Sequence, residues 1–213
     1  ALRDALHRGP RVPTATYRLQ LQSAFTFEDA RAVVAYLARL GISDAYASPL
    51  FRAKPGSTHG YDVCDFGQLN PELGGEPAFT ALAAELAARG MGLVVDFVPN
   101  HMAVEPVLNP WWRDVLEHGP ASAHARFFDI DWSPEKPELR GKVLLPFLGD
   151  HYGRVLERGE LALEFHGGEL AVVYAGLSRP LDPKCYPVVL RRGLDALRAE
   201  AGEADLHLQE FLS

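Results

Sequence analysis

Apolar residues in the first hundred positions recur with two different spacings, which alternate along the chain. Residues 14–21 (TATYRLQL) are rich in β-forming residues and alternate loosely, which predicts a strand. A helical spacing follows from Thr26 and stops at Gly41, and Asp29 stands where a capping-box acid would reach back to Thr26. The apolar face of this predicted helix is formed by Phe27, Ala30, Val33, Val34, Leu37 and Leu40.

The same alternation continues to about residue 101. Residues 42–47 predict a second strand, and 48–75 read as a long loop. Residues 76–90 predict a second helix, and 91–101 (MGLVVDFVPNH) a nearly all-apolar third strand. Strand, helix, strand, helix, strand is typical of βαβ units in a parallel sheet. A strand that is apolar on both sides is expected where helices cover one face and a barrel interior or second layer covers the other. The inner side chains of the second helix are Phe79, Leu82 and Leu86.

In parallel α/β folds the ligand site lies at the carboxyl ends of the strands. The loop after the second strand contains the stretch 57–66 (STHGYDVCDF), which holds an imidazole, a phenol and two carboxylates. Asp96 to His101 close the third strand. We therefore expect these two segments to be neighbours at one rim of the sheet.

The pattern changes after His101. A short helix is predicted to begin at Asn109, and residues 142–174 have strand character with a hairpin around Gly167 and Gly168. Residues 188–201 predict a helix, as do the first ten residues up to Gly9 and Pro10. A β-rich insertion thus follows the third strand.

Composition excludes several classes of function. The formal net charge of -7 and the scattered Lys and Arg residues leave no basic stripe for nucleic acid or an anionic membrane. No apolar run is long enough to span a bilayer, and Cys64 and Cys185 form neither a metal motif nor a disulfide framework, so we expect a cytoplasmic protein. A closed (β/α)8 barrel needs on the order of 250 residues. Because only three βα units are visible among 213 residues, we expect this chain to be part of a larger enzyme.

Two short motifs carry candidate binding residues. In DFVPNH, His101 could exchange hydrogen bonds with a ligand hydroxyl or be structural, and Asp96 and Asn100 are groups that fix a loop by accepting backbone N–H bonds. In HGYDV, the ring of Tyr61 could seat a sugar; alternatively it fills the barrel mouth while Asp62 pairs with an arginine. The paired Trp111 and Trp112 are candidates for core packing and for sugar stacking.

No catalytic pair is assigned from the acids near this rim. A retaining glycosidase needs two carboxyl groups about 5 to 5.5 Å apart, one of them a general acid. The acids near the predicted rim are Asp62, Asp65, Asp96 and Glu105, and none stands at the end of a fourth or later strand.

The motifs together resemble the α-amylase superfamily of glycoside hydrolases, whose first signature region is similar to DFVPNH and whose domain B is inserted after strand three. Over nearly the whole of its length, the chain more closely resembles the N-terminal portion of the maltooligosyltrehalose synthase family. The motifs that carry this are PTATYRLQL, GISDAYASPLFRAKPGSTHGYDV, LNPELGG, GLVVDFVPNHM, NPWWRDVLEHGP, ARFFDIDW, KVLLPFLGDHYGRVLERGEL and PLDPKCYP. The implied fold is α/β: residues 1–101 supply the first three βα units of a (β/α)8 barrel, and residues 102–213 a domain B-like subdomain and the start of the return to the barrel.

The resemblance implies an intramolecular transglucosidase that turns the reducing-end α-1,4 link of a maltooligosaccharide into an α,α-1,1 link, with no cofactor or metal and with its catalytic carboxylates on later strands. It further implies an α-1,4-glucan substrate and pairing with a maltooligosyltrehalose hydrolase. A hydrolytic α-amylase relative and a non-catalytic glycan-binding fragment are the alternatives.

The resemblance also implies roles for single residues. Tyr61 would stack under the sugar before the scissile bond, and His101 would bond a hydroxyl of that sugar. Asp96 and Asn100 would brace the loop after the third strand. Thr58 stands where some superfamily members carry a sugar-gripping Asp, and the implied substitutes for that Asp are His59 and Asp62.

Overall fold

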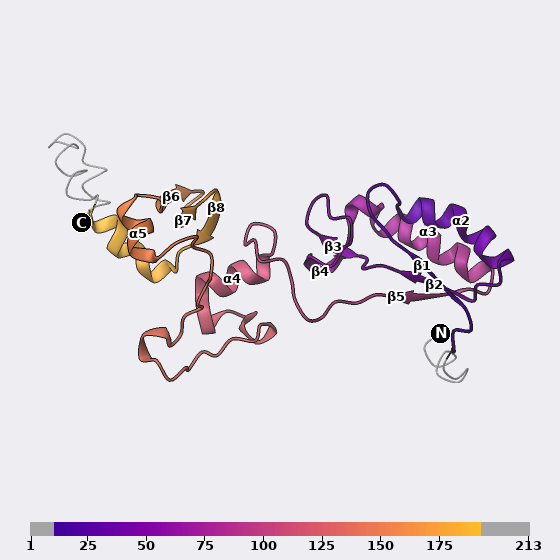
Figure 1. The fold of residues 1–213 in the computed structure, drawn as a ribbon, viewed down its shortest axis with the longest axis horizontal. Coiled ribbons are helices and arrows are strands. Elements are labelled where there is room, and N and C mark those ends of the chain that lie inside the picture. Colours follow the sequence, from indigo (N-terminus) through magenta and orange to yellow (C-terminus); the bar gives the residue numbers. More distant parts are fainter. Residues whose placement is uncertain (1–10, 193–213) are drawn as a thin grey trace, which may run out of the picture. The chain divides into compact units, whose positions relative to one another are not determined.

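The structure, a computed structural model, describes residues 11–192. The helix predicted for residues 1–10 and the part of the helix predicted for 188–201 that follows residue 192 lie outside the described residues. The chain divides between Val104 and Glu105 into two compact units, and each is considered by itself (Figure 1).

The first unit is built on a parallel sheet, as predicted. Strands β1 (Thr16–Leu19), β2 (Asp44–Ala47) and β5 (Gly92–Val95) lie in the order β1-β2-β5, and both pairings are parallel. Helices α2 (Phe27–Arg39) and α3 (Gly75–Ala88) connect the strands and lie together on the same face of the sheet (Figure 1). The βαβ alternation read from the sequence is therefore confirmed.

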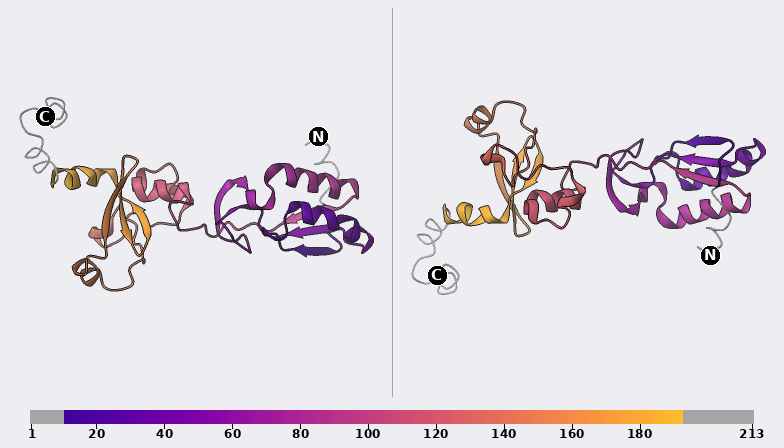
Figure 2. Two further views of the ribbon diagram at one scale, coloured as in Figure 1. Left: turned by 90° about the horizontal axis from the view of Figure 1, so that it is seen from above. Right: turned by 90° about the horizontal axis from the view of Figure 1, so that it is seen from below.

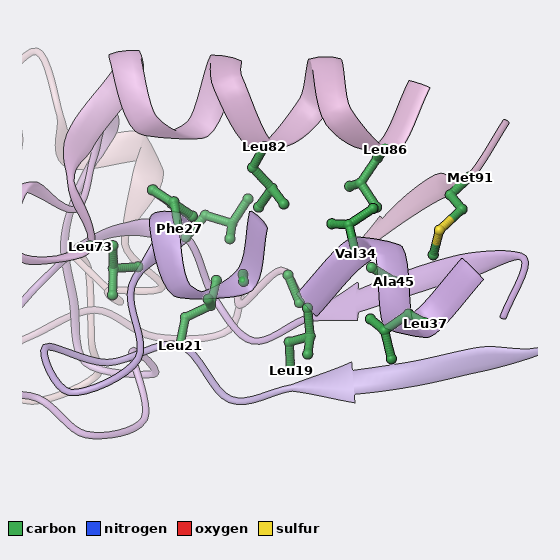
Figure 3. Packing of buried hydrophobic residues seen from close by; sticks show 13 residues of the cluster. Leu19, Leu21, Phe27, Val34, Leu37, Ala45, Leu73, Leu82, Leu86 and Met91 are labelled. Carbon is green, nitrogen blue, oxygen red and sulfur yellow. The ribbon is translucent and has the colours of Figure 1, made fainter. Parts of the chain in front are cut away.

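The core of this unit lies between the two helices and the sheet (Figure 3). Phe27 is fully buried and meets Phe79 edge to face, with ring centroids 5.5 Å apart. Each large apolar side chain buried in this way stabilises the fold by about 1.5–3 kcal/mol. The larger buried side chains are Leu19, Leu21, Phe27, Val34, Leu37, Leu73, Leu82, Leu86 and Met91.

The capping box predicted for α2 is present. Thr26 N donates to Asp29 Oδ2 at 2.8 Å, and Asp29 N donates to Thr26 Oγ1 at 3.5 Å. The helix ends at Arg39, one residue earlier than its apolar spacing suggests. Leu40 is therefore 53% exposed, and its prediction as part of the buried face was wrong because it lies beyond the last helical turn.

The prediction of a loop over 48–75 was wrong in its middle. Strands β3 (Phe51–Ala53) and β4 (Val63–Leu69) pair there as an antiparallel hairpin, followed by a short 3-10 helix over Pro71–Leu73. The pairing register shifts on both sides of Arg52, so apolar residues do not alternate regularly. Cross-strand pairing overrides the weak strand propensity of VCDFGQL.

The third predicted strand is shorter and more exposed than its composition suggested. β5 ends at Val95, and the hydrogen bond from Asp96 N to Ala47 O at 3.0 Å continues its pairing with β2. Val95 is 39% and Phe97 55% exposed within the described part of this unit. Phe97 contacts Phe51 on the hairpin, with ring centroids 6.0 Å apart.

The second unit carries helix α4 (Pro110–His118), helix α5 (Tyr152–Glu157) and an antiparallel sheet of β6 (Ala162–His166), β7 (Glu169–Tyr174) and β8 (Leu177–Pro180) (Figure 2). The predicted hairpin is confirmed as β6 and β7. The predicted strand character before it was wrong, because described residues 142–161 form α5 and irregular segments.

Helix α4 begins where the sequence predicted. Asn109 caps it, and the Asn109 side-chain oxygen accepts from Trp112 N at 3.1 Å. Trp111 and Trp112 are both half-buried. The Trp111 ring stacks on His124 with centroids 5.3 Å apart, and Trp112 packs on Phe128 at 5.0 Å. Both tryptophans therefore serve local packing.

Towards its end, the described part of the chain is helical over residues 186–192, which agrees with the start of the last predicted helix. Within residues 11–192, none of the helices is both long and apolar enough to cross a membrane.

Candidate functional site

Four polar side chains meet at the carboxyl ends of the parallel strands. Arg18 on β1 and Tyr46 on β2 are partners in register and so project to the same face of the sheet. Asp96 follows the last residue of β5, and Tyr61 comes from the loop that leads into β4. We call Arg18, Tyr46, Tyr61 and Asp96 the rim cluster.

Asp96 is the centre of the rim cluster. Its Oδ2 accepts hydrogen bonds from the Tyr61 hydroxyl at 2.5 Å, from Arg18 Nη1 at 2.9 Å and from the Tyr46 hydroxyl at 3.5 Å. Arg18 Nη2 also donates to the Tyr61 hydroxyl at 3.0 Å, and Arg18 Cζ lies 4.4 Å from the centre of the Tyr46 ring. Three side chains from separate segments thus donate to one carboxylate oxygen.

These contacts fix the charge state of Asp96. The hydrogen bond from Tyr61, followed by the bond from Arg18, holds the pKa of the Asp96 carboxyl below its usual range, against the opposing effect of burial. Asp96 is therefore ionised at neutral pH. A lowered pKa is the wrong direction for a carboxyl group that must donate a proton as a general acid.

The loop before Tyr61 is held by its own side chains. Asp62 Oδ1 accepts from the Ser57 hydroxyl at 2.5 Å, and Ser57 Oγ accepts from Gly60 N at 3.1 Å. Asp62 thus bonds a serine in place of the arginine that one reading of the sequence suggested. Gly60 has φ +75°, and a Cβ there would lie 3.0 Å from Pro49 O, so the turn that presents Tyr61 requires glycine.

The remaining predicted site residues have other partners. His59 is exposed, its Nδ1 accepts from Tyr61 N at 3.0 Å, and its ring lies beside the Tyr61 ring with centroids 5.9 Å apart. Asn100 and His101 are exposed in the segment after β5, where Asn100 Nδ2 and His101 Nδ1 are 3.4 Å apart. Asp65 Oδ1 accepts from Gly67 N at 2.7 Å and closes a local turn.

Sequence reasoning missed Arg18 and Tyr46. The available signal was a cation in TYRL and a phenol in DAYA, both at positions that should otherwise be apolar in a buried parallel strand.

Among residues 11–192, no three His, Cys, Asp or Glu side chains lie together as a metal site would require.

Comparison with known proteins identifies the family. The model of the α-amylase catalytic domain matches residues 32–154, more than half of the chain. The putative maltooligosyl trehalose synthase of Mycobacterium tuberculosis (strain CDC 1551 / Oshkosh) is 46% identical, over 70% of this chain and 21% of its own length. The intracellular maltogenic amylase of Bacillus subtilis (strain 168) is 34% identical over 46% of this chain and 16% of its own length.

Solved structures agree with the sequence relatives. The maltooligosyltrehalose synthase from Arthrobacter ramosus superposes with a TM-score of 0.67 and 43% identity, over 80% of this chain and 21% of that one. This chain spans about a fifth of the length of these synthases. The resemblance to the N-terminal portion of such synthases, expected from the motifs, is confirmed. With its parallel βαβ units and its matching catalytic-domain model, this chain belongs to the α-amylase catalytic-domain family.

Proposed function

We propose that the protein containing this chain is an intramolecular transglucosidase that converts maltooligosaccharides into maltooligosyl trehalose. The observation that carries this proposal is the contrast between relatives. Identity to the Mycobacterium tuberculosis maltooligosyl trehalose synthase homologue is 46% over 70% of the chain, whereas identity to the maltogenic amylase is 34% over 46%. The similarity to the synthase therefore extends over much more of the chain than the similarity to the amylase.

The proposed reaction uses a retaining mechanism. A carboxylate attacks the anomeric carbon, the α-1,4 bond breaks, and a general acid gives its proton to the departing glucose. The freed glucose turns and attacks the glycosyl-enzyme ester through its anomeric hydroxyl. The proton of that hydroxyl returns to the carboxylate that had served as the general acid, and the nucleophile carboxylate is released. The α,α-1,1 bond forms in place of a bond to water, which requires a closed site that holds the glucose. We assign the nucleophile and acid to later strands and no catalytic residue to this chain, so the chain alone is expected to be inactive.

This chain supplies one wall of the proposed sugar site. Tyr61 offers its ring to the sugar before the scissile bond, and Asp96 holds the Tyr61 hydroxyl at 2.5 Å. His101, exposed beyond β5, is proposed to bond a hydroxyl of the same sugar, with Asn100 bracing its segment. His59 is the next candidate contact because it lies beside the Tyr61 ring.

Asp62 is proposed as a further sugar contact through the carboxylate oxygen that Ser57 does not occupy.

The proposed domain division assigns residues 1–101 to the barrel and 102–213 to domain B and the start of the return to the barrel. The protein is proposed to act in the cytoplasm on α-1,4-glucans, beside a hydrolase that releases trehalose from its product.

The test is to incubate the full-length protein with maltopentaose and count reducing ends. Loss of reducing ends without a fall in total glucose units supports the proposal. A gain in reducing ends would assign the protein to the hydrolytic amylases instead.

Calorimetric titration of maltopentaose into this 213-residue chain tests the alternative that the chain is a non-catalytic glycan-binding fragment. Binding by the chain alone, together with a full-length protein that changes no reducing ends, would favour a glycan-binding module.

A further inference from the structure

The proposed function leaves Arg18 without a role, although Arg18, like Asp96, contacts the three other members of the rim cluster. Its two terminal nitrogens reach different partners, since Nη1 donates to Asp96 at 2.9 Å and Nη2 to the Tyr61 hydroxyl at 3.0 Å. Its guanidinium also covers the Tyr46 ring at 4.4 Å. The side chain is 33% exposed.

We infer that Arg18 is a positioning residue, which fixes the Tyr61 ring for sugar binding by clamping its hydroxyl against Asp96. The inference rests on the proposed function, in which the Tyr61 ring is a sugar platform. Arg18 acts through Tyr61 and Asp96 and is not assigned a contact with the substrate.

The geometry explains why a second bond to the Tyr61 hydroxyl matters. Tyr61 follows the glycine turn at Gly60 and precedes β4, so its backbone lies where the loop enters the strand. With the Asp96 bond alone, the ring could swing about a single hydrogen bond. Arg18 donates to the same oxygen from another strand, and two bonds from different directions fix both the place and the tilt of the ring.

The same arrangement limits what Tyr61 can recognise. A phenol has one proton to donate, and Tyr61 gives it to Asp96. The hydroxyl therefore has no proton left for a sugar oxygen, and the face of the ring remains as the contact surface. A ring face meets the C–H groups of a pyranose, so Tyr61 selects a sugar ring by its shape, and its contribution depends on a fixed orientation.

Arginine is the residue type that this position needs. Its planar fork presents separate donors to two acceptors at a fixed angle, whereas lysine offers a single charged nitrogen. Arg18→Lys keeps the charge beside Asp96 but cannot hold both partners. Arg18→Met keeps the length of the side chain and removes both the charge and the donors.

The experiment is a double-mutant cycle in the full-length protein with maltopentaose as substrate. Arg18→Met is expected to raise KM by about tenfold and to change kcat by less than about threefold, since a misplaced platform weakens ground state and transition state alike. Arg18→Lys should recover part of the loss. In a Tyr61→Phe background, Arg18→Met should raise KM by less than about twofold, because the shared hydroxyl is already gone. Arg31→Met on the exposed surface of α2, where Arg31 pairs with Glu28, is the matched control and should leave both constants unchanged.

Equal effects of Arg18→Met in the wild-type and Tyr61→Phe backgrounds would overturn the inference, as would an unchanged KM in a folded Arg18→Met protein. Crystal structures of the wild type and Arg18→Met give a readout that needs no substrate, and the Tyr61 ring should leave its single position in the variant. If the wild type converts no maltooligosaccharide, the proposed function fails while the position of the ring still decides the role of Arg18, and an unmoved ring overturns it. Should Arg18→Met not fold, Arg18→Lys carries both measurements.

Discussion

Replacing Gly92 by alanine tests the sheet that carries the rim cluster. Gly92 opens β5 and is the register partner of Asp44 on β2. A Cβ at position 92 would lie 2.0 Å from Asp44 Oδ1 and 2.6 Å from Arg11 Nε, and real Cβ atoms essentially never show contacts under 3.0 Å. Gly92→Ala must therefore push the Asp44 carboxylate away from the place where it bonds Arg11.

The cost follows from what Asp44 loses. Its side chain is 3% exposed, and it accepts from Arg11 Nε at 2.6 Å and from the Ser43 hydroxyl at 2.6 Å. A hydrogen bond to a charged group contributes about 1.5–3 kcal/mol, and a buried carboxylate left without its partner costs more. The half-exposed Arg11 side chain lowers the ionic part of this loss. With a gain of about 0.5–1 kcal/mol for replacing a strand glycine, we expect Gly92→Ala to destabilise the first unit by about 2–3 kcal/mol.

Urea unfolding of the full-length protein, followed by hydrogen exchange in β2 and β5, measures this change. Gly153→Ala on α5 is the control, because a Cβ there meets nothing within 4 Å and its φ is not positive. In an Asp44→Ala background, Gly92→Ala should cost less than about 1 kcal/mol, since the displaced carboxylate is gone. If Gly92→Ala costs the same in both backgrounds, or no more than Gly153→Ala, the reasoning is refuted.

Three further predictions concern the site and the second unit. Tyr61→Ala in the full-length protein should raise KM for maltopentaose by about tenfold or more, because the sugar loses the aromatic face on which it stacks, and unchanged kinetics would disprove the stacking role. Because Tyr61 and Arg18 hold the pKa of Asp96 below its usual range, its stabilising effect is complete above the ordinary carboxyl pKa of about 3.9 and is lost as the pH falls through the lowered value. The difference in unfolding free energy between wild type and Asp96→Asn should then stay constant above about pH 5 and shrink as the pH falls below about 4, and a difference that stays constant below about pH 4 would contradict this. Asn109→Ala should destabilise the second unit by about 1–2 kcal/mol, since Trp112 N loses its capping acceptor, while Asn109→Asp should cost much less in the same thermal melt.

The helices and the parallel sheet of the first unit could be predicted because their apolar spacing is local and strong. The α2 pattern extends over three turns between a capping box and a glycine. The β3 and β4 hairpin could not be predicted, since β4 contains Asp65, Gly67 and Gln68 and is stabilised by its partner. Local propensity carries no information about a partner strand whose register shifts twice.

The rim cluster was predictable only in part, for a similar reason. Asp96 and Tyr61 follow from the rule that ligand groups gather where parallel strands end. Arg18 lies 78 residues from Asp96 and 43 from Tyr61, and it stands inside a strand. A residue within a strand is expected to pack against its neighbours, so the contacts of Arg18 with Tyr46 and Tyr61 become visible only in the structure.

The acids gathered near this rim now have separate structural partners, which bears on where the chemistry resides. Asp62 accepts from Ser57, Asp65 from the backbone of Gly67, and Asp96 from Tyr61 and Arg18. A general acid for glycoside cleavage needs a raised pKa and a free proton, but the pKa of Asp96 is lowered by its donors. The carboxylates in STHGYDVCDF and DFVPNH therefore bond the loop and the Tyr61 hydroxyl, and we propose that proton transfer belongs to groups on other strands.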